Sequence, residues 1–151
     1  MSFVSELTDA TNLAGAGAIA VDRAARVLWV CAFATNRLTA VNIANPASMT
    51  VLGSYNSAPF CRSPRAVVLA GTVAYVLEGG GGNPQLTAIN IGNPAAPTRI
   101  SSVVVTTSAV DALAVDAANG VAYCLRRGSV GAPCVIFSVS IANPAAMTVL
   151  G

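Results

Sequence analysis

Short apolar runs alternate with turn residues along the whole chain, and the runs are rich in Val, Ile and Ala. Runs of this length that contain β-branched residues and are bounded by Gly, Asn, Asp or Pro are typical of β-strands. Residues 6–20 contain helix formers but keep no apolar period near 3.6 residues, so no helix is expected there. The pattern therefore predicts an all-β fold.

The strands fall into groups of four. Paired apolar runs that are split by a short turn occupy residues 18–33, 66–79 and 112–128. Turns that contain Asp, Asn or Gly between apolar runs predict β-hairpins. A third strand is expected at residues 37–43, 85–91 and 135–141. A fourth strand is expected at residues 50–57 and 98–107.

An Asn-Pro pair follows each third strand, at Asn45-Pro46, Asn93-Pro94 and Asn143-Pro144. Pro has no N–H to donate to a sheet, and Asn can hydrogen-bond its own backbone, so the pair ends the strand in a turn. The pairs recur at a spacing of about 50 residues, which is the length of a four-stranded propeller blade. Trp29, Tyr75 and Tyr123 share one position of this repeat.

The third strands are mostly apolar on both faces, as in Leu38–Ile43. Such strands suit a sheet that is packed on both sides by neighbouring sheets. We therefore expect a single repeat domain over residues 1–151, built from three four-stranded antiparallel blades. The repeat units cover residues 9–57, 58–107 and 108–151, and residues 2–8 form a strand that closes a blade.

The phrase "INIGNPAAPTRIS" at 89–101, preceded by "VAYV" at 73–76, resembles the LVIVD repeat of β-propeller proteins. The copies at 41–53 and 139–151 carry Met49 and Met147 where the repeat prefers the second Pro, which is present as Pro97. The resemblance covers essentially the whole chain as three units and implies a propeller fold. Proteins with this repeat are often surface or secreted proteins of undefined activity, so the resemblance transfers no catalytic residue.

Three blades do not close a propeller, which has about four to eight. Hydrophobic residues make up 54% of the chain and charged residues 9%, whereas an ordinary soluble domain has about 25% charged residues. Copies of the chain that cover one another's apolar surface explain this composition. We expect a homodimer with six blades, in which residues 2–8 complete the partner's third unit. A fragment or an engineered half of a longer propeller is the alternative explanation of the same boundaries.

Charge and cysteine content exclude several classes of protein. The net charge is only +2, and the eight basic residues are scattered arginines, which argues against nucleic acid as a partner. The longest apolar stretch, residues 66–77, is shorter than the roughly 18–20 residues of a spanning helix. No signal peptide is recognised at the N-terminus, so a cytoplasmic or virion-associated protein is compatible with the sequence. Four cysteines without CxxC spacing, in a chain without His, predict no zinc site.

The loops between the second and third strands differ most among the units, and irregular loops on a regular scaffold often carry binding. The candidate ligand-binding residues are Asn36, Arg37, Glu78, Asn83, Arg126 and Arg127. Glu78 is the carboxylate that we place at the mouth of such a loop, whereas Asp22 and Asp116 are expected to cap hairpin turns. The run Gly79–Gly82 reads as a turn rather than an anion site, because no Gly-Lys-Ser/Thr follows it. Asp111 precedes an innermost strand and so approaches a central channel.

Cys31 and Cys124 lie among apolar neighbours and are assigned to the core. Without His, neither a Cys–His pair nor a Ser–His–Asp triad can form within the chain. We therefore expect no catalytic residue, no metal and no cofactor. The preferred function is a non-enzymatic, self-assembling scaffold that binds a protein through its loops. The alternatives are a propeller that binds glycans or other small ligands and a metal-dependent propeller hydrolase.

Overall fold

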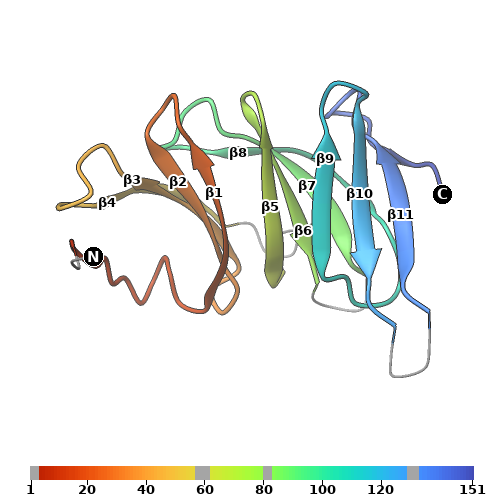
Figure 1. The fold of residues 1–151 in the computed structure, drawn as a ribbon, viewed down its shortest axis with the longest axis horizontal. Helices are drawn as coiled ribbons and strands as arrows, with labels where there is room; N and C mark the ends of the chain where they lie inside the picture. Colours follow the sequence, from red (N-terminus) through yellow and green to blue (C-terminus); the bar gives the residue numbers. More distant parts are fainter. Residues whose placement is uncertain (1–3, 57–61, 80–82, 129–132) are drawn as a thin grey trace.

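The computed structural model describes residues 4–56, 62–79, 83–128 and 133–151, and this part of the chain forms three four-stranded antiparallel sheets without a helix (Figure 1). Blade 1 consists of β1 (Ala16–Asp22), β2 (Val27–Ala32), β3 (Arg37–Asn42) and β4 (Thr50–Tyr55). Blade 2 consists of β5 (Pro64–Ala70), β6 (Val73–Glu78), β7 (Gln85–Asn90) and β8 (Thr98–Val104). Blade 3 consists of β9 (Ala112–Asp116), β10 (Val121–Arg126), β11 (Val135–Ser140) and β12 (Thr148–Val149). The predicted all-β class and the three blade-like repeats are confirmed.

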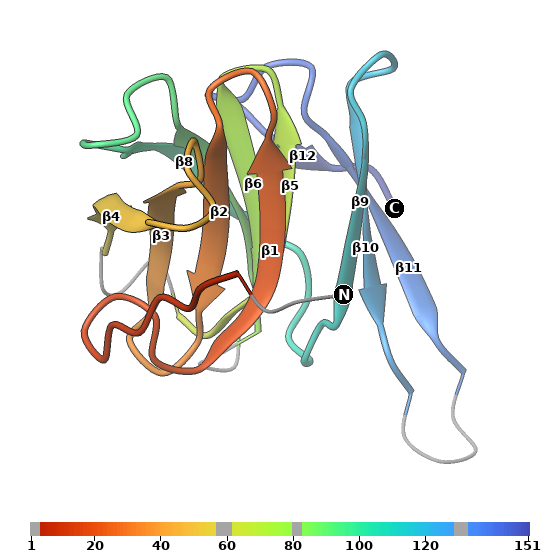
Figure 2. The ribbon, with the colours of Figure 1, turned by 60° about the vertical axis from the view of Figure 1, so that its left-hand side comes forward.

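Within each blade the strands pair in sequence order, as expected for a propeller blade. The first strands of neighbouring blades lie close together, because β1 contacts β5 and β5 contacts β9. The three sheets therefore follow one another in a row, with their first strands along one side (Figures 1 and 2). No helix in the described ranges is long and apolar enough to cross a membrane.

Aspartates cap two of the hairpin turns, as the sequence predicted. Asp22 Oδ1 accepts a hydrogen bond from the backbone N–H of Ala25. Asp116 accepts bonds from both the backbone and the side chain of Asn119. Hydrogen bonding, above all from the Asn119 side chain, holds the pKa of Asp116 below its ordinary value. Both carboxylates therefore stabilise the hairpin turns that they cap.

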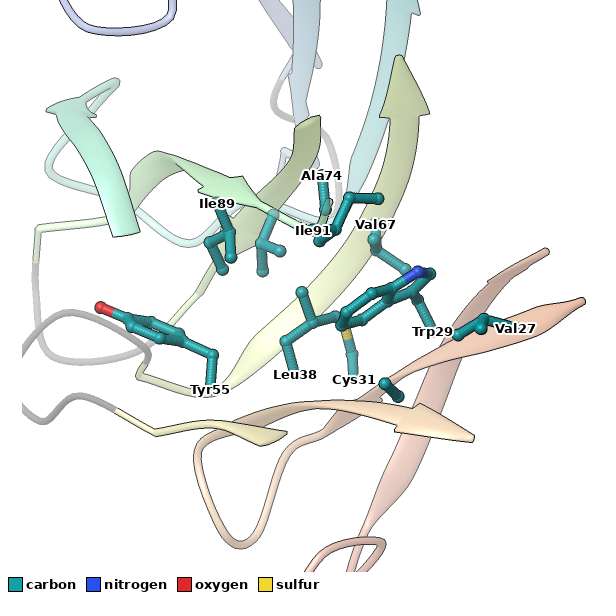
Figure 3. Packing of buried hydrophobic residues seen from close by; sticks show 11 residues of the cluster. Val27, Trp29, Cys31, Leu38, Tyr55, Val67, Ala74, Ile89 and Ile91 are labelled. Carbon is teal, nitrogen blue, oxygen red and sulfur yellow. The ribbon is translucent and has the colours of Figure 1, made fainter. Parts of the chain in front are cut away.

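Each blade has two faces, which we name by their neighbours. The leading face points toward the next blade along the chain and carries Trp29, Tyr75 or Tyr123, and the trailing face points toward the preceding blade. Between blades 1 and 2, Trp29 and Leu38 of one leading face pack with Val67 and Ile89 of the next trailing face (Figure 3). A second buried cluster joins blades 2 and 3 in the same way. The core therefore lies between the sheets.

The prediction that Cys31 and Cys124 belong to the core is confirmed. Cys31 lies in the cluster between blades 1 and 2, and Cys124 lies in the cluster between blades 2 and 3. Both are buried free thiols, whereas Cys134 is an exposed free thiol. Burial raises the pKa of Cys31 to about 12, so this thiol stays protonated and unreactive. Cys61 lies outside the described residues.

The Asn-Pro turns repeat the same geometry in all three blades. The side chains of Asn45, Asn93 and Asn143 each accept a hydrogen bond from the backbone N–H two residues later. These turns also join the blades, because the fourth strand of one blade lies against the turn of the next. Ser101 of β8, for example, donates a hydrogen bond from Oγ to the carbonyl of Pro144.

Another close approach of this kind is made by Gly53 of β4. A Cβ at this position would lie 2.4 Å from the carbonyl oxygen of Ala95. We expect Gly53→Ala to lower the free energy of unfolding by about 1–3 kcal/mol, because backbone atoms would have to move apart. Gly17→Ala is the matched control, since its Cβ would meet nothing closer than 3.8 Å. Urea unfolding of the two variants tests this, and equal stabilities would contradict it.

The part of the predicted N-terminal strand that the structure describes, residues 4–8, pairs with no strand in the isolated chain. Residues 2–3 of that strand lie outside the described residues. The segment rests on blade 1, where Ser5 Oγ donates a hydrogen bond to the carbonyl of Pro46. Its pairing with a second chain, and closure of the ring, stay predictions.

Candidate functional site

The loops between second and third strands all leave the blades at one edge, which we call the loop edge and which is the lower edge in Figure 1. The six predicted ligand-binding residues belong to these loops or to the strand ends beside them. Asn36 and Arg37 belong to blade 1, Glu78 and Asn83 to blade 2, and Arg126 and Arg127 to blade 3. The structure thus places them along one edge, but it gives them different environments.

Asn36 and Arg37 are engaged within the protein. Asn36 adopts a positive φ of 55°, and its Oδ1 accepts a hydrogen bond from the backbone N–H of Ser63 at the start of blade 2. Arg37 Nη1 donates to Ser54 Oγ of β4 at 2.8 Å. These contacts join blade 1 to blade 2 and β3 to β4, so both residues have a structural use at the loop edge.

Glu78, at the end of β6, is buried rather than exposed at a loop mouth. Its side chain is 1% exposed. Oε1 accepts a hydrogen bond from Thr87 Oγ1 at 2.5 Å, and Oε2 accepts one from the backbone N–H of Arg62 at 3.1 Å. Burial raises the pKa of Glu78 to about 7, although the two hydrogen bonds act in the opposite direction. At 1% exposure, this carboxylate is not accessible to a ligand at the surface.

The remaining candidates are more accessible. Asn83 is exposed, beside Gly80–Gly82, which lie outside the described residues. Arg126 is half-buried at the end of β10. The side chain of Arg127 is 76% exposed, and its Nε lies 4.0 Å from Asp111 Oδ2. Asp111 also accepts a hydrogen bond from the backbone N–H of Arg127.

Asp111 joins two arginines at the inner side of the loop edge. Arg65, from β5 of blade 2, approaches its Oδ1 with Nη1 at 3.9 Å. Both ion pairs are long and partly exposed, and pairs of this kind contribute little to stability. The charged groups are therefore held near one another without being strongly bound to one another, which leaves them able to hydrogen-bond a ligand.

A cavity of about 290 Å³ opens beside this group. Its lining combines small residues with an aromatic ring, a guanidinium and a carboxylate, namely Gly15, Gly17, Phe33, Pro64, Arg65 and Asp111. Phe33 is 47% exposed. An exposed ring face beside polar groups can stack a planar or ring-shaped molecule while the polar groups fix its orientation. We call this set of residues the inner-edge pocket.

Sequence reasoning missed Phe33 and Arg65. The available signal was Phe33 itself, a large aromatic side chain immediately after the buried second strand. Nothing in the sequence joined it to Arg65 and Asp111, which lie far away along the chain and meet it only when β1, β5 and β9 line up. In the described part of the chain, no three His, Cys, Asp or Glu side chains form a group that could hold a metal ion.

Comparison with known proteins supports the blade architecture. The LVIVD repeat family matches residues 30–57, which run from β2 through the end of β4 in blade 1. No curated protein matches the chain significantly. The family match bears out the resemblance that the Asn-Pro phrase indicated.

Proposed function

We propose that this chain, which carries an LVIVD repeat within three β-propeller blades, is a non-enzymatic interaction scaffold that binds partners at its loop edge. The observation that carries the proposal is the inner-edge pocket, where Phe33, Arg65 and Asp111 from three different blades come together among irregular loops. Loops held by a rigid scaffold are the usual location of binding residues. The partner expected for the scaffold is a protein.

Most carboxylates of the described residues hydrogen-bond within the chain, which supports a binding function rather than catalysis. Asp9, Asp22 and Asp116 accept backbone hydrogen bonds in turns. Glu78 is buried against Thr87. General acid–base catalysis and glycoside hydrolysis need titratable groups that face the substrate together. Asp111 is the carboxylate that lines the inner-edge pocket, and it is paired with arginines.

A carbohydrate ligand is the second candidate, and Phe33 favours it. Sugar rings present apolar C–H faces that stack on aromatic rings, and their hydroxyl groups hydrogen-bond to carboxylates and guanidinium groups. The inner-edge pocket offers all three partners within one cavity of about 290 Å³. A single sugar unit is of a size that fits a cavity at the low end of ordinary ligand sites, which span about 300–1,000 Å³.

Two binding experiments test these candidates with one set of variants. For the scaffold, proteins cross-linked to the wild-type chain in an extract of its source are compared with those cross-linked to Phe33→Ala and Arg65→Ala. Specific partners that both variants lose support the loop edge as the binding surface, and identical sets of partners contradict it. The control is Val104→Ala, which alters a side chain that is also half exposed but lies on the fourth strand β8, outside the inner-edge pocket.

For the carbohydrate candidate, the same proteins are applied to a glycan array. We expect Phe33→Ala to weaken binding of the recognised glycan up to about tenfold, because an aromatic contact contributes roughly 0.5–1.5 kcal/mol beyond its buried area. Val104→Ala should leave binding unchanged. A wild-type chain that binds no glycan on the array removes this candidate and leaves the protein-binding proposal to the cross-linking result.

A further inference from the structure

The fourth strand of blade 3 covers only part of its neighbour. β12 pairs with Val139 and Ser140 of β11, and Leu150 and Gly151 extend the contact to Ser138. In blade 2, by contrast, β8 pairs with β7 along its whole length. In the described part of the chain, the outer edge of β11 from Val135 to Phe137 therefore has no neighbouring strand. An open strand edge presents N–H and C=O groups that can pair with another chain.

The leading face of blade 3 is also uncovered. Tyr123 is 43% exposed, whereas Trp29 and Tyr75, at the same position of blades 1 and 2, are 1% and 3% exposed. Ile136 beside it is 66% exposed. A shallow cavity of about 230 Å³ lies over this face, and its lining also includes Leu125. The position that is buried in the other blades thus lacks its cover here.

The matching surface is found at the other end of the row, on the trailing face of blade 1. Ile19 and Val21 are exposed there. A cavity of about 560 Å³ runs over this face, with an apolar lining that includes Ile19, Leu28, Val30 and Val41. The equivalent trailing face of blade 2 receives Trp29 in the core. In the described residues, no trailing face covers the leading face of blade 3, and blade 1 presents one that is free.

The N-terminal segment lies where it can take part in this contact. Between blades 2 and 3, Ser101 of the fourth strand β8 donates a hydrogen bond to the carbonyl of Pro144 in the next blade's turn. On blade 1, Ser5 makes the same kind of bond to the carbonyl of Pro46. Residues 4–8 thus occupy, on blade 1, the side where the fourth strand of a preceding blade would lie.

We propose that two copies of this chain join head to tail at two identical contacts, and that residues 4–8 of each copy add a strand beside Val135–Phe137 of the other. The leading face of each blade 3 packs on the trailing face of the other copy's blade 1, so that Tyr123 enters the cavity lined by Leu28 and Val30. Backbone pairing at an open edge adds affinity to the apolar contact. The two contacts, related by a two-fold axis, close a six-bladed ring, which is within the range of known propellers.

This inference deepens the proposed function, because the ring is the assembled form of the scaffold. It uses the blade faces and not the inner-edge pocket. Binding at the loop edge and ring closure are therefore tested by different variants. Loss of partner binding in Phe33→Ala tests only binding at the loop edge. The mass and the cross-links of the blade-face variants test only ring closure.

Light scattering on a sizing column, repeated across dilution, tests the packing of the faces. The wild-type chain is expected to have twice the mass of the 15.1 kDa chain. Tyr123→Asp and Ile136→Asp are expected to weaken association at least a hundredfold and to elute as folded monomers, since both side chains are exposed in the isolated chain. Val104→Asp, on β8, is the matched control and should remain dimeric. A wild-type monomer, a larger open assembly, or a dimer that survives both variants would overturn the ring.

A disulfide cross-link tests the added strand. Cys134 is exposed and directly precedes β11. A strand antiparallel to β11 brings its later residues toward this cysteine, so Thr8→Cys is expected to form a reducible cross-link between two chains. The link should disappear when Cys134→Ser is added. Asp22→Cys, at the end of β1 where the hairpin turn of blade 1 begins, should not form it. A dimer that depends on Tyr123 but gives no link from position 8 would overturn the strand addition alone.

Discussion

Glu78→Gln is expected to stabilise the protein at pH 8 by about 3 kcal/mol relative to the wild type. In the folded chain, burial raises the pKa of Glu78 from its ordinary 4.5 to about 7. Above pH 7 the buried side chain must carry a charge that has been removed from water, and this difference in pKa corresponds to about 3 kcal/mol. Gln is neutral at every pH. Its single oxygen can accept from the backbone N–H of Arg62, while its amide N–H donates to Thr87 Oγ1, because a hydroxyl can also accept a hydrogen bond.

The sign of the pH dependence follows from the raised pKa. Between about pH 4.5 and 7, Glu78 is protonated in the folded state but ionised in the unfolded state. Its contribution to the free energy of unfolding is therefore fully present below pH 4.5 and is lost as the pH rises through 7. Hydrogen bonds from Asn12 and Asn119 lower the pKa values of Asp9 and Asp116 below their ordinary 3.8. The contributions of these two carboxylates to stability therefore change only below about pH 3.8, outside this window.

Urea unfolding at several values between pH 5 and pH 8 measures this effect. The wild type should lose stability over this range, and Glu78→Gln should show a flatter profile. Glu6→Gln, at an exposed carboxylate, serves as the control and should follow the wild type. Parallel profiles for the wild type and Glu78→Gln would mean that the carboxylate is better solvated than the structure shows.

Trp29→Ala is expected to lower the free energy of unfolding by about 3–5 kcal/mol, the usual cost of removing a large aromatic side chain from a core. Trp29 is 1% exposed and packs between blades 1 and 2 (Figure 3). In a chain of this size each kcal/mol corresponds to about 2–4 °C in Tm. Differential scanning calorimetry should therefore show a decrease of roughly 6–20 °C.

Two further variants serve as controls for the core position of Trp29. Val104→Ala removes apolar atoms from a side chain that is 50% exposed, and its cost should stay below about 1 kcal/mol. Trp29→Phe should cost less than Trp29→Ala, because Phe keeps a ring and removes an indole N–H that has no hydrogen-bond partner among the described residues. A decrease for Trp29→Ala no larger than that for Val104→Ala would contradict the core position.

The strands could be predicted from the sequence because their signals are local. β3 was expected at residues 37–43 and is found at Arg37–Asn42, between a turn and an Asn-Pro pair that stop the ladder on either side. The two faces of the blades also followed from the apolar alternation. The irregularities were less accessible. Between Ala40 and Val41 the register shifts because β4 carries one extra residue, Leu52, and the apolar alternation of β3 does not indicate it.

The candidate site could be predicted only in outline. The loop edge followed from differences among the repeats, but the environment of each residue depends on other blades. Glu78 is buried because Thr87 of the adjacent strand and the backbone of Arg62 enclose it. The inner-edge pocket needs Phe33, Arg65 and Asp111 to converge from three repeat units, and no spacing along one chain encodes that approach.

The row of blades has a further consequence for how the protein unfolds. Blade 2 is covered on both faces by buried clusters, while blades 1 and 3 each have one covered face. In such nearest-neighbour architectures each unit gains stability from the interfaces it shares, so fraying starts at the ends of the row. The proposed ring has no end. Two apolar interfaces would have to separate before any blade could open, and the lifetime of the folded state would be set by dissociation.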